Sequence, residues 1–571
     1  MSRLNPFVRK HGLVVAASVA FSVSLVVLLY ILYFQSFGLS LRRALFGGII
    51  VAVLSFLSLA LIFYLKRKHY FEDQARFLKN LGFWTFLALL LSPCFFPIPH
   101  YPTSPLFQAT SNLKITVDYP DEENDPVQLK GVWLRFDDKT YSYEDFIFSG
   151  EWEAESDHFF LSPGSVGELI WQGSIGERAT LTLFPLDKRA KVTILWDGEK
   201  FDSILVDKPF IVNKKSSTPF SYYALIVITR IVCFGFAFFV FFSVFESVDS
   251  LNKRQIAVFV LLALLGLYSV YLQFENPELK GRLDLQIGRH NAVISGAALD
   301  PWQYRVFAEW LIEALVFAAK PLGIADPYLW IFVFLRVLQN FTIFLLAYFY
   351  FRKLAFSEVV SLAGIIFLTG SLLNSFHQSD LSFNTYFDLI FYLGAGLLIL
   401  NDFFQLLPYL MVFASLNRET SGLIPFMGFS SLQNFRTDRA KLASILFSLV
   451  VWTVIFFLLR ALYPDRELFI PYGYHPGPEL LSYNLTPFSL ILFLRFLSFA
   501  PFVGLLYYRQ WSPLLKRLFI AIVPLWFLVH FLGGVVSEAR LFLVPQALVF
   551  IPLFLCYMRE YYPAGGQSQV V

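Results

Sequence analysis

Long apolar runs, separated by short polar segments, occupy most of the chain. A helix needs about 20 mainly apolar residues to cross the hydrocarbon core of a membrane. The runs are rich in Leu, Phe, Val and Ile and contain few charged residues. We therefore predict fourteen membrane-spanning helices, at 13–34, 44–65, 81–96, 221–245, 256–273, 328–351, 358–374, 386–401, 403–417, 421–434, 442–462, 488–508, 518–535 and 541–557.

A polar interval at 98–219 follows a different pattern. In LKITVDY (113–119) every second residue faces one side, as in a strand with one buried face. Similar runs recur at GVWLRF, ELIWQG, ATLTLF and KVTILW, and WDGEKF (196–201) contains the Asp-Gly signal of a tight hairpin. This spacing predicts an antiparallel β-sandwich. Its tryptophans fit either sugar stacking or core packing, and core packing is the commoner role.

Clusters of Lys and Arg in the short loops set the orientation, because cytoplasmic loops carry an excess of these residues. The predicted spans place all the clusters on one side, so we expect both termini in the cytoplasm and the sandwich outside. The segment VFAEWLIEALVFAAKPL (306–322) must then not cross the membrane. Glu309 and Glu313 share one helical face there, which predicts an amphipathic helix on the outer surface. The clusters are Arg3, Arg9, Lys10, Lys66, Arg67, Lys68, Arg76, Lys79, Lys253, Arg254, Arg352, Lys353, Arg436, Arg439, Lys441, Arg509, Lys516, Arg517 and Arg559.

Composition narrows the class of protein further. Hydrophobic residues make up 57% of the chain and aromatic residues 19%, which excludes a water-soluble globule. The net charge of +3 gives no reason to expect nucleic acid as a partner. We expect an α-helical polytopic protein of a prokaryotic plasma membrane. The sequence indicates no certain cofactor. The acidic run at 121–125 fits either a binding site for a divalent cation or a solvated turn, and a solvated turn is the commoner role of such a run.

The pattern divides the chain into five parts. Residues 1–97 hold the first three predicted spans, and 98–219 form the external β-sandwich. Residues 220–250 contribute the fourth span and a cytoplasmic linker. Residues 251–560 form a second membrane module, and 561–571 are a short cytoplasmic tail.

With this orientation, several charged and aromatic residues gather on the external side, and charges at membrane depth are usually functional or paired. One interpretation is mutual neutralisation, Arg418 with Glu419 and Arg540 with Glu538. The other is that Arg305, Arg418 and Arg540 grip a phosphate, because guanidinium groups bind phosphate in a fork geometry. The candidate substrate-binding residues are His290, Asp300, Tyr304, Arg305, Arg418, Glu419, His475, Glu538 and Arg540.

The order of elements over about 250–560 resembles the GT-C superfamily of membrane glycosyltransferases, which use polyprenyl-linked sugars. In that superfamily an outward-running span is followed closely by the catalytic acid and then by surface helices. Asp284 matches the acid, and PWQYR (301–305), NRET (417–420) and SEARLFLVP (537–545) look like other elements of the group. Leu285 stands where many members have a second acid. The tyrosine that often follows is replaced by Ile287 and Gly288.

The resemblance implies a GT-C-like architecture and a sugar-transfer reaction. The donor would be a lipid-linked sugar of the polyprenyl-phosphate type, and the acceptor an external glycan, lipid or protein. Asp284 would be the general base that deprotonates the acceptor hydroxyl.

Two other functions fit the same chain. One is a transporter or flippase for a lipid-linked glycan, which would favour an internal repeat and polar residues near mid-membrane. The other is a non-catalytic assembly or sensor protein whose sandwich is the binding module. The sequence contains no evident internal repeat.

Overall fold

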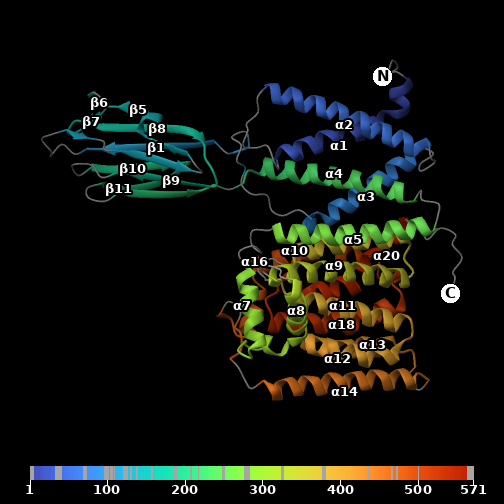
Figure 1. The fold of residues 1–571 in the computed structure, drawn as a ribbon. Coiled ribbons are helices and arrows are strands. Elements are labelled where there is room, and N and C mark those ends of the chain that lie inside the picture. Colours follow the sequence, from blue (N-terminus) through green and yellow to red (C-terminus); the bar gives the residue numbers. More distant parts are fainter. Residues whose placement is uncertain are drawn as a thin grey trace. The chain divides into compact units, whose positions relative to one another are not determined.

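The structure of the 571-residue chain is a computed structural model, and Figure 1 shows its fold. Long helices account for most of the chain, and strands occur between Thr110 and Lys215. The structure describes residues 6–31, 41–67, 74–95, 102, 107–108, 110–119, 126–128, 131–136, 139–155, 158–184, 190–205, 209–216, 218–246, 251–275, 283–322, 327–375, 381–434, 437–463, 467–470, 473–498 and 500–561. The acidic run at 121–125 and nearly all of the predicted tail lie outside these residues.

Eight helices in the described residues are long and apolar enough to cross a membrane, or nine if one bent pair is a single span. The chain is therefore a multi-pass membrane protein. Each of the eight overlaps a predicted span. They are Gly12–Leu29, Phe220–Phe242, Arg254–Phe274, Pro327–Lys353, Phe383–Leu400, Arg439–Leu462, Pro513–Gly533 and Ala539–Arg559.

The other predicted spans correspond to shorter or broken helices. Four match apolar helices of 10–17 residues, at Gly47–Ile62, Phe77–Leu90, Glu358–Asn374 and Phe404–Asn417. The run at 421–434 holds the nine-residue helix α13, Leu423–Ser431. The run at 488–508 begins in a pair of helices that bend by 68° between Asn484 and Pro487. The count of fourteen spans stays a prediction.

Contacts divide the chain into two compact units. The first contains residues 1–81 and 98–237, and the second residues 82–97 and 238–571. The helices of the first unit are α1 (Pro6–Leu29) and α2 (Leu41–Arg67), which pack together. Helices α3 (Gln74–Phe95) and α4 (Phe220–Glu246) each include residues of both units.

The strands of the first unit form three antiparallel sheets, a five-stranded sheet β11-β10-β1-β8-β5, a four-stranded sheet β12-β9-β3-β4 and a three-stranded sheet β2-β7-β6. The inward side chains of the first two sheets share one core, so the predicted sandwich is present. The strands are β1 (Thr110–Asp118), β2 (Val127–Gln128), β3 (Val132–Phe136), β4 (Lys139–Tyr141), β5 (Ile147–Gly150), β6 (Trp152–Glu155), β7 (His158–Leu161), β8 (Val166–Ser174), β9 (Arg178–Leu183), β10 (Ala190–Trp196), β11 (Glu199–Leu205) and β12 (Phe210–Lys215).

The hairpin predicted at WDGEKF joins β10 to β11. Trp196 pairs with Glu199, so Asp197 and Gly198 form a two-residue turn. Both have positive φ, 48° and 86°, as such a turn requires. Trp171 and Trp196 are core residues, as the packing interpretation predicts, whereas Trp133 is 50% exposed.

The second unit contains the remaining helices. Long helices in it run roughly side by side, whereas α7 and α8 run across them (Figure 1). The helices are α5 (Leu251–Glu275), α7 (Leu283–Ile294), α8 (Val306–Ala319), α9 (Pro327–Lys353), α10 (Glu358–Asn374), α11 (Phe383–Leu400), α12 (Leu407–Asn417), α13, α14 (Arg439–Leu462), α15 (Pro478–Asn484), α16 (Pro487–Leu497), α17 (Ala500–Leu506), α18 (Pro513–Gly533), α19 (Leu543–Pro545) and α20 (Ile551–Tyr561).

Helix α8 is the segment for which an amphipathic surface helix is predicted. It is not among the candidate spans of the described residues, and it crosses the direction of the long helices in Figure 1. The face with the two glutamates was expected to be exposed to water, and the structure gives it a different role. Glu309 is buried, and both Glu309 and Glu313 face α7. The face that the sequence marks as polar is thus partly an internal contact.

Helices α12 and α13 run up and down the side of α14. Asp402, before α12, forms an ion pair with Lys441 near the start of α14, and Leu416 packs with Leu459 near its end. Gly428 in α13 again lies against the early part of α14, at Ile445. The chain therefore reverses between α12 and α13. The residues at this reversal, 417–422, are those that interrupt the apolar pattern.

Candidate functional site

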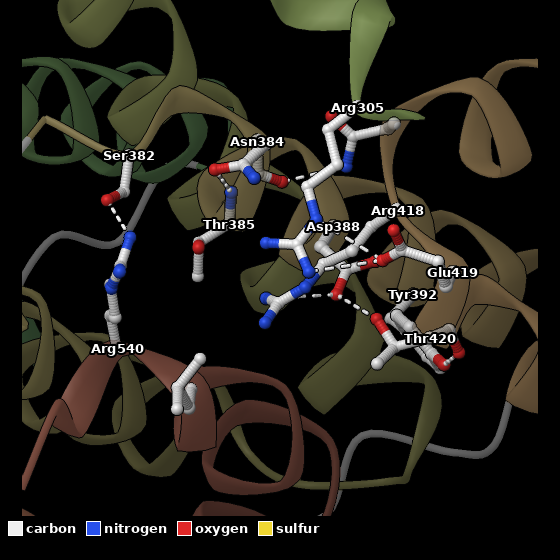
Figure 2. Close-up of polar contacts among 12 residues, drawn as sticks. Arg305, Ser382, Asn384, Thr385, Asp388, Tyr392, Arg418, Glu419, Thr420 and Arg540 are labelled. Carbon is white, nitrogen blue, oxygen red and sulfur yellow. Dashed lines mark hydrogen bonds and ion pairs between the residues drawn. The ribbon is translucent and has the colours of Figure 1, made fainter. Parts of the chain in front are cut away.

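Three segments meet where the chain reverses. The residue before α8 is Arg305, the early part of α11 contributes Asp388, and the reversal contributes Arg418, Glu419 and Thr420. Asn417 fixes the reversal to α11 by donating a 2.7 Å hydrogen bond from its Nδ2 to the Asn384 carbonyl. Figure 2 shows the Arg305 and Arg418 side chains directed into the same space.

Arg305 pairs with Glu419. The Arg305 Nε and Nη2 atoms both lie 3.2 Å from Glu419 Oε2, and both side chains are largely buried. The other carboxylate oxygen, Oε1, is buried without a hydrogen-bond partner in the described part of the chain. The neutralisation interpretation placed Glu419 with its sequence neighbour Arg418. That pairing is wrong, because adjacent residues point in different directions and Glu419 turns toward Arg305.

Arg418 is a buried cation with incomplete hydrogen bonding. Its Nη1 atom lies 3.7 Å from Asp388 Oδ2, and the two side chains are 5% and 0% exposed. The Arg418 Nε and Nη1 atoms have no hydrogen-bond partner among the described residues. Asp388 Oδ2 accepts a 3.0 Å hydrogen bond from the Thr420 hydroxyl, while Oδ1 accepts none from that part of the chain. Buried polar groups are nearly always hydrogen-bonded, so this pair has hydrogen-bonding capacity that the described residues do not use.

Arg540 contributes a third positive charge to the same region. The charges of Arg305 and Arg540 both act on Arg418. Arg540 is itself held by Glu538, whose Oε2 accepts from its Nε at 3.0 Å and its Nη2 at 2.6 Å, and it also contacts the Ser382 hydroxyl. The pairing of Arg540 with Glu538 is therefore the one that mutual neutralisation predicts. Of the three arginines, Arg418 lies farthest from its carboxylate partner, at 3.7 Å.

Asp284, the candidate general base, occupies the first turn of α7 and is exposed. The buried face of α7 includes Gln286, His290 and Val293, so Asp284 lies on a different face. The structure describes no direct contact between Asp284 and the arginines.

His290 has two carboxylate partners rather than an open side. Its Nδ1 lies 2.7 Å from Glu309 Oε2, and its Nε2 lies 2.7 Å from Glu313 Oε1. Tyr328 also donates to Glu313, at 2.9 Å. Burial lowers the pKa of His290, but the hydrogen bonds and charges of the two glutamates outweigh it and raise the pKa above its ordinary value. His290 thus fastens α7 to α8, which is a positioning role and differs from the substrate contact expected for it.

The remaining candidates lie in neighbouring contacts. The Tyr304 hydroxyl donates to Asp300 Oδ2 at 3.0 Å, and the Arg460 guanidinium lies 4.3 Å from the centre of the Tyr304 ring. These contacts fix the turn that leads into Arg305. His475 is exposed, and its backbone N–H donates to Glu479 at 3.1 Å. No described contact joins His475 to the arginines.

The sequence interpretation missed Asp388, the buried carboxylate beside Arg418. It lies inside a run assigned as a plain membrane span. A signal was present, because Asn384, Asp388 and Tyr392 recur every fourth residue and share one helical face. The Tyr392 hydroxyl donates to the Thr420 carbonyl, so this face carries the contacts that hold the reversal in place.

Metal ligands do not cluster in the described residues: no group of three or more His, Cys, Asp or Glu side chains there could hold a metal ion. Comparison with known proteins adds no identification, since no family model, no curated protein and no solved structure matches the chain.

Proposed function

We propose that this protein is a membrane glycosyltransferase of GT-C-like architecture. It transfers a sugar from a lipid carrier of the polyprenyl-phosphate type to an external glycan, lipid or protein. The observation that carries the proposal is Arg418, a buried arginine with unused hydrogen-bond donors, set beside Arg305 and within the field of Arg540. An isolated buried cation is unfavourable, and a phosphate would supply the missing acceptors.

The donor phosphate binds at Arg418 in this proposal. The three arginines face the carboxylates Asp388, Glu419 and Glu538, so their formal charges balance before a ligand arrives. Arg305 and Arg540 are already hydrogen-bonded to carboxylates, whereas the Arg418–Asp388 contact is an ion pair at 3.7 Å without a hydrogen bond between them. A single phosphate charge therefore meets least competition at Arg418.

The chemical step follows from this placement. The acceptor hydroxyl oxygen attacks the anomeric carbon of the sugar and forms the new glycosidic bond. The bond from that carbon to the phosphate oxygen breaks, and its electron pair leaves with the carrier phosphate, whose charge Arg418 and Arg305 stabilise. The acceptor proton passes to the Asp284 carboxylate and then to water. Asp284 is exposed on α7, where a water-borne acceptor reaches it.

Donor binding tests the proposal. Purified full-length protein in detergent is titrated with undecaprenyl phosphate, and the change in intrinsic tryptophan fluorescence gives the affinity. Loss of one charge-assisted hydrogen bond weakens binding by about 1.5–3 kcal/mol, so Arg418→Ala should bind roughly 10–150-fold more weakly. Arg418→Lys should recover only part of this, because an ammonium group lacks the fork geometry.

Arg352→Ala provides a matched control. Arg352 is an exposed arginine in the last turn of α9 that donates to the Phe356 backbone carbonyl. The Arg352→Ala variant should bind undecaprenyl phosphate with the affinity of the wild type. Equal affinities for wild type and Arg418→Ala would count against the phosphate site. Movement of lipid-linked glycan between vesicle leaflets without any sugar transfer would favour the transporter function instead.

A further inference from the structure

The outer face of the four-stranded sheet differs in its side chains from the outer face of the five-stranded sheet. On the four-stranded sheet the outward positions of β3, β9 and β12 fall in register, and one row consists of Trp133, Thr182 and Ile211. The next row consists of Arg135, Thr180 and Asn213. Trp133 is half exposed and belongs to the outward face, away from the sandwich core.

The exposed indole is held in place by its neighbours. Phe184 meets the Trp133 ring edge to face, with 4.9 Å between the ring centres. Phe184 is in turn fixed at the end of β9, because its backbone N–H donates to the Gly131 carbonyl and its ring lies where a Gly131 side chain would stand. A braced aromatic ring on a rigid sheet loses little conformational freedom when it binds a flat ligand.

Beside the indole lies a row of hydrogen-bonding side chains. The Thr180 hydroxyl donates to Asn213 Oδ1 at 2.9 Å, which orients the amide, and Arg135 completes the row. Neighbouring strands lie about 4.8 Å apart, and outward positions along one strand about 7 Å apart. A pyranose ring stacked on Trp133 would therefore have its hydroxyl groups within reach of the second row.

The charges at the described outward positions of these three strands have one sign. The charged side chains at the outward positions of β3, β9 and β12 are Arg135, Arg178 and Lys215, and none of the three forms an ion pair with another described residue. The opposite face, on the five-stranded sheet, has mixed charges that neutralise one another. Lys114 pairs with Glu168 at 2.7 Å, and Lys200 pairs with Asp202 at 3.0 Å.

We infer that the outer face of the four-stranded sheet binds an acidic polysaccharide. Trp133 stacks against the apolar face of a sugar ring, as aromatic rings do. Thr180, Thr182 and Asn213 bond its hydroxyl groups, and the three cations pair with the carboxylate or sulfate groups of the chain. This site is separate from the arginine site and does not depend on the transfer reaction.

The test uses full-length protein in nanodiscs of neutral lipid, immobilised for biolayer interferometry. Polygalacturonate is the acidic probe and dextran the neutral one. The wild type should bind polygalacturonate more tightly than dextran, and this binding should weaken as salt is raised. Trp133→Ala should weaken it by at least about tenfold, as loss of a central tryptophan commonly does. Trp133→Tyr should retain most of it, because a flat aromatic surface remains.

The opposite face provides matched controls. Leu195→Ala and Lys191→Ala remove an exposed apolar and an exposed basic residue from β10, and both variants should bind like the wild type. Equal binding by wild type and Trp133→Ala would overturn the inference, and so would binding of neither polysaccharide. Binding to vesicles of phosphatidylglycerol that equals binding to polygalacturonate would also overturn it, since it would mark the face as a general anionic-membrane contact.

Discussion

Breaking the pair of Arg418 and Asp388 should destabilise the protein strongly. The charged atoms are 3.7 Å apart and buried, which corresponds to an attraction of about 4.5 kcal/mol at an effective dielectric constant of about 20. Arg418→Met removes the cation and leaves the Asp388 carboxylate buried with Thr420 as its described hydrogen-bond donor. Removing one partner of a buried pair typically costs about 3–5 kcal/mol.

A double-mutant cycle separates this interaction from general damage. Asp388→Asn should also destabilise, because it leaves the Arg418 guanidinium without its counter-charge. The double variant Arg418→Met/Asp388→Asn should be more stable than the sum of the two single effects implies, by about 2–4 kcal/mol, because neither charge is then buried alone.

The assay follows buried thiols as the protein unfolds in detergent. Cys233 and Cys556 are buried, so a thiol-reactive dye reports unfolding on heating or in denaturant. Single effects that add to within about 0.5 kcal/mol would mean that the two side chains do not interact, and the predicted pair would then be wrong.

Three further predictions address other parts of the chain. The raised pKa of His290 means that its protonated form stabilises the fold. This contribution to stability is complete below pH 6.5, the ordinary pKa of histidine, and is lost as the pH rises through the pKa of the folded state. His290→Gln should therefore flatten the dependence of stability on pH above pH 6.5 in the same thiol assay. A Cβ atom at Gly422 would lie 2.7 Å from the Trp452 ring, so Gly422→Ala should lower the free energy of unfolding by about 1–3 kcal/mol. Gly288→Ala is the control, because a Cβ atom there meets no atom within 4 Å and should not lower the free energy of unfolding. A cysteine at the exposed Thr437 should react with an impermeant maleimide only after cells are opened, and labelling in intact cells would invert the predicted orientation.

Some features follow from local sequence alone. The Asp197–Gly198 turn was predictable because its residues tolerate positive φ and the flanking strands alternate. The long apolar helices were predictable because their length matches the hydrocarbon core. The shorter helices α12 and α13 were harder to predict from the sequence, because the reversal of the chain between them depends on contacts with α11 and α14.

The pairing within the site depends on packing between distant segments. Arg305 and Glu419 are 114 positions apart, and only the docking of α8 against the reversal brings them together. Sequence proximity favoured Glu419 as the partner of Arg418, whereas the fold supplies Asp388 from α11 instead. The loops predicted to be external did point to the arginines, because a charge that interrupts an apolar run is costly unless it has a partner or a function.

The most direct test of the central claim measures sugar transfer. Full-length protein in liposomes receives a polyprenyl phosphate with a radiolabelled sugar and a panel of glycan, lipid and peptide acceptors. We expect the wild type to transfer the sugar. We also expect a loss of about 100–10,000-fold in turnover for Asp284→Asn, with undecaprenyl phosphate binding unchanged, since this variant removes a general base but no phosphate contact. Wild-type turnover in Asp284→Asn would contradict the assignment of the base, and absence of transfer by the wild type with every donor and acceptor would contradict the proposed function itself.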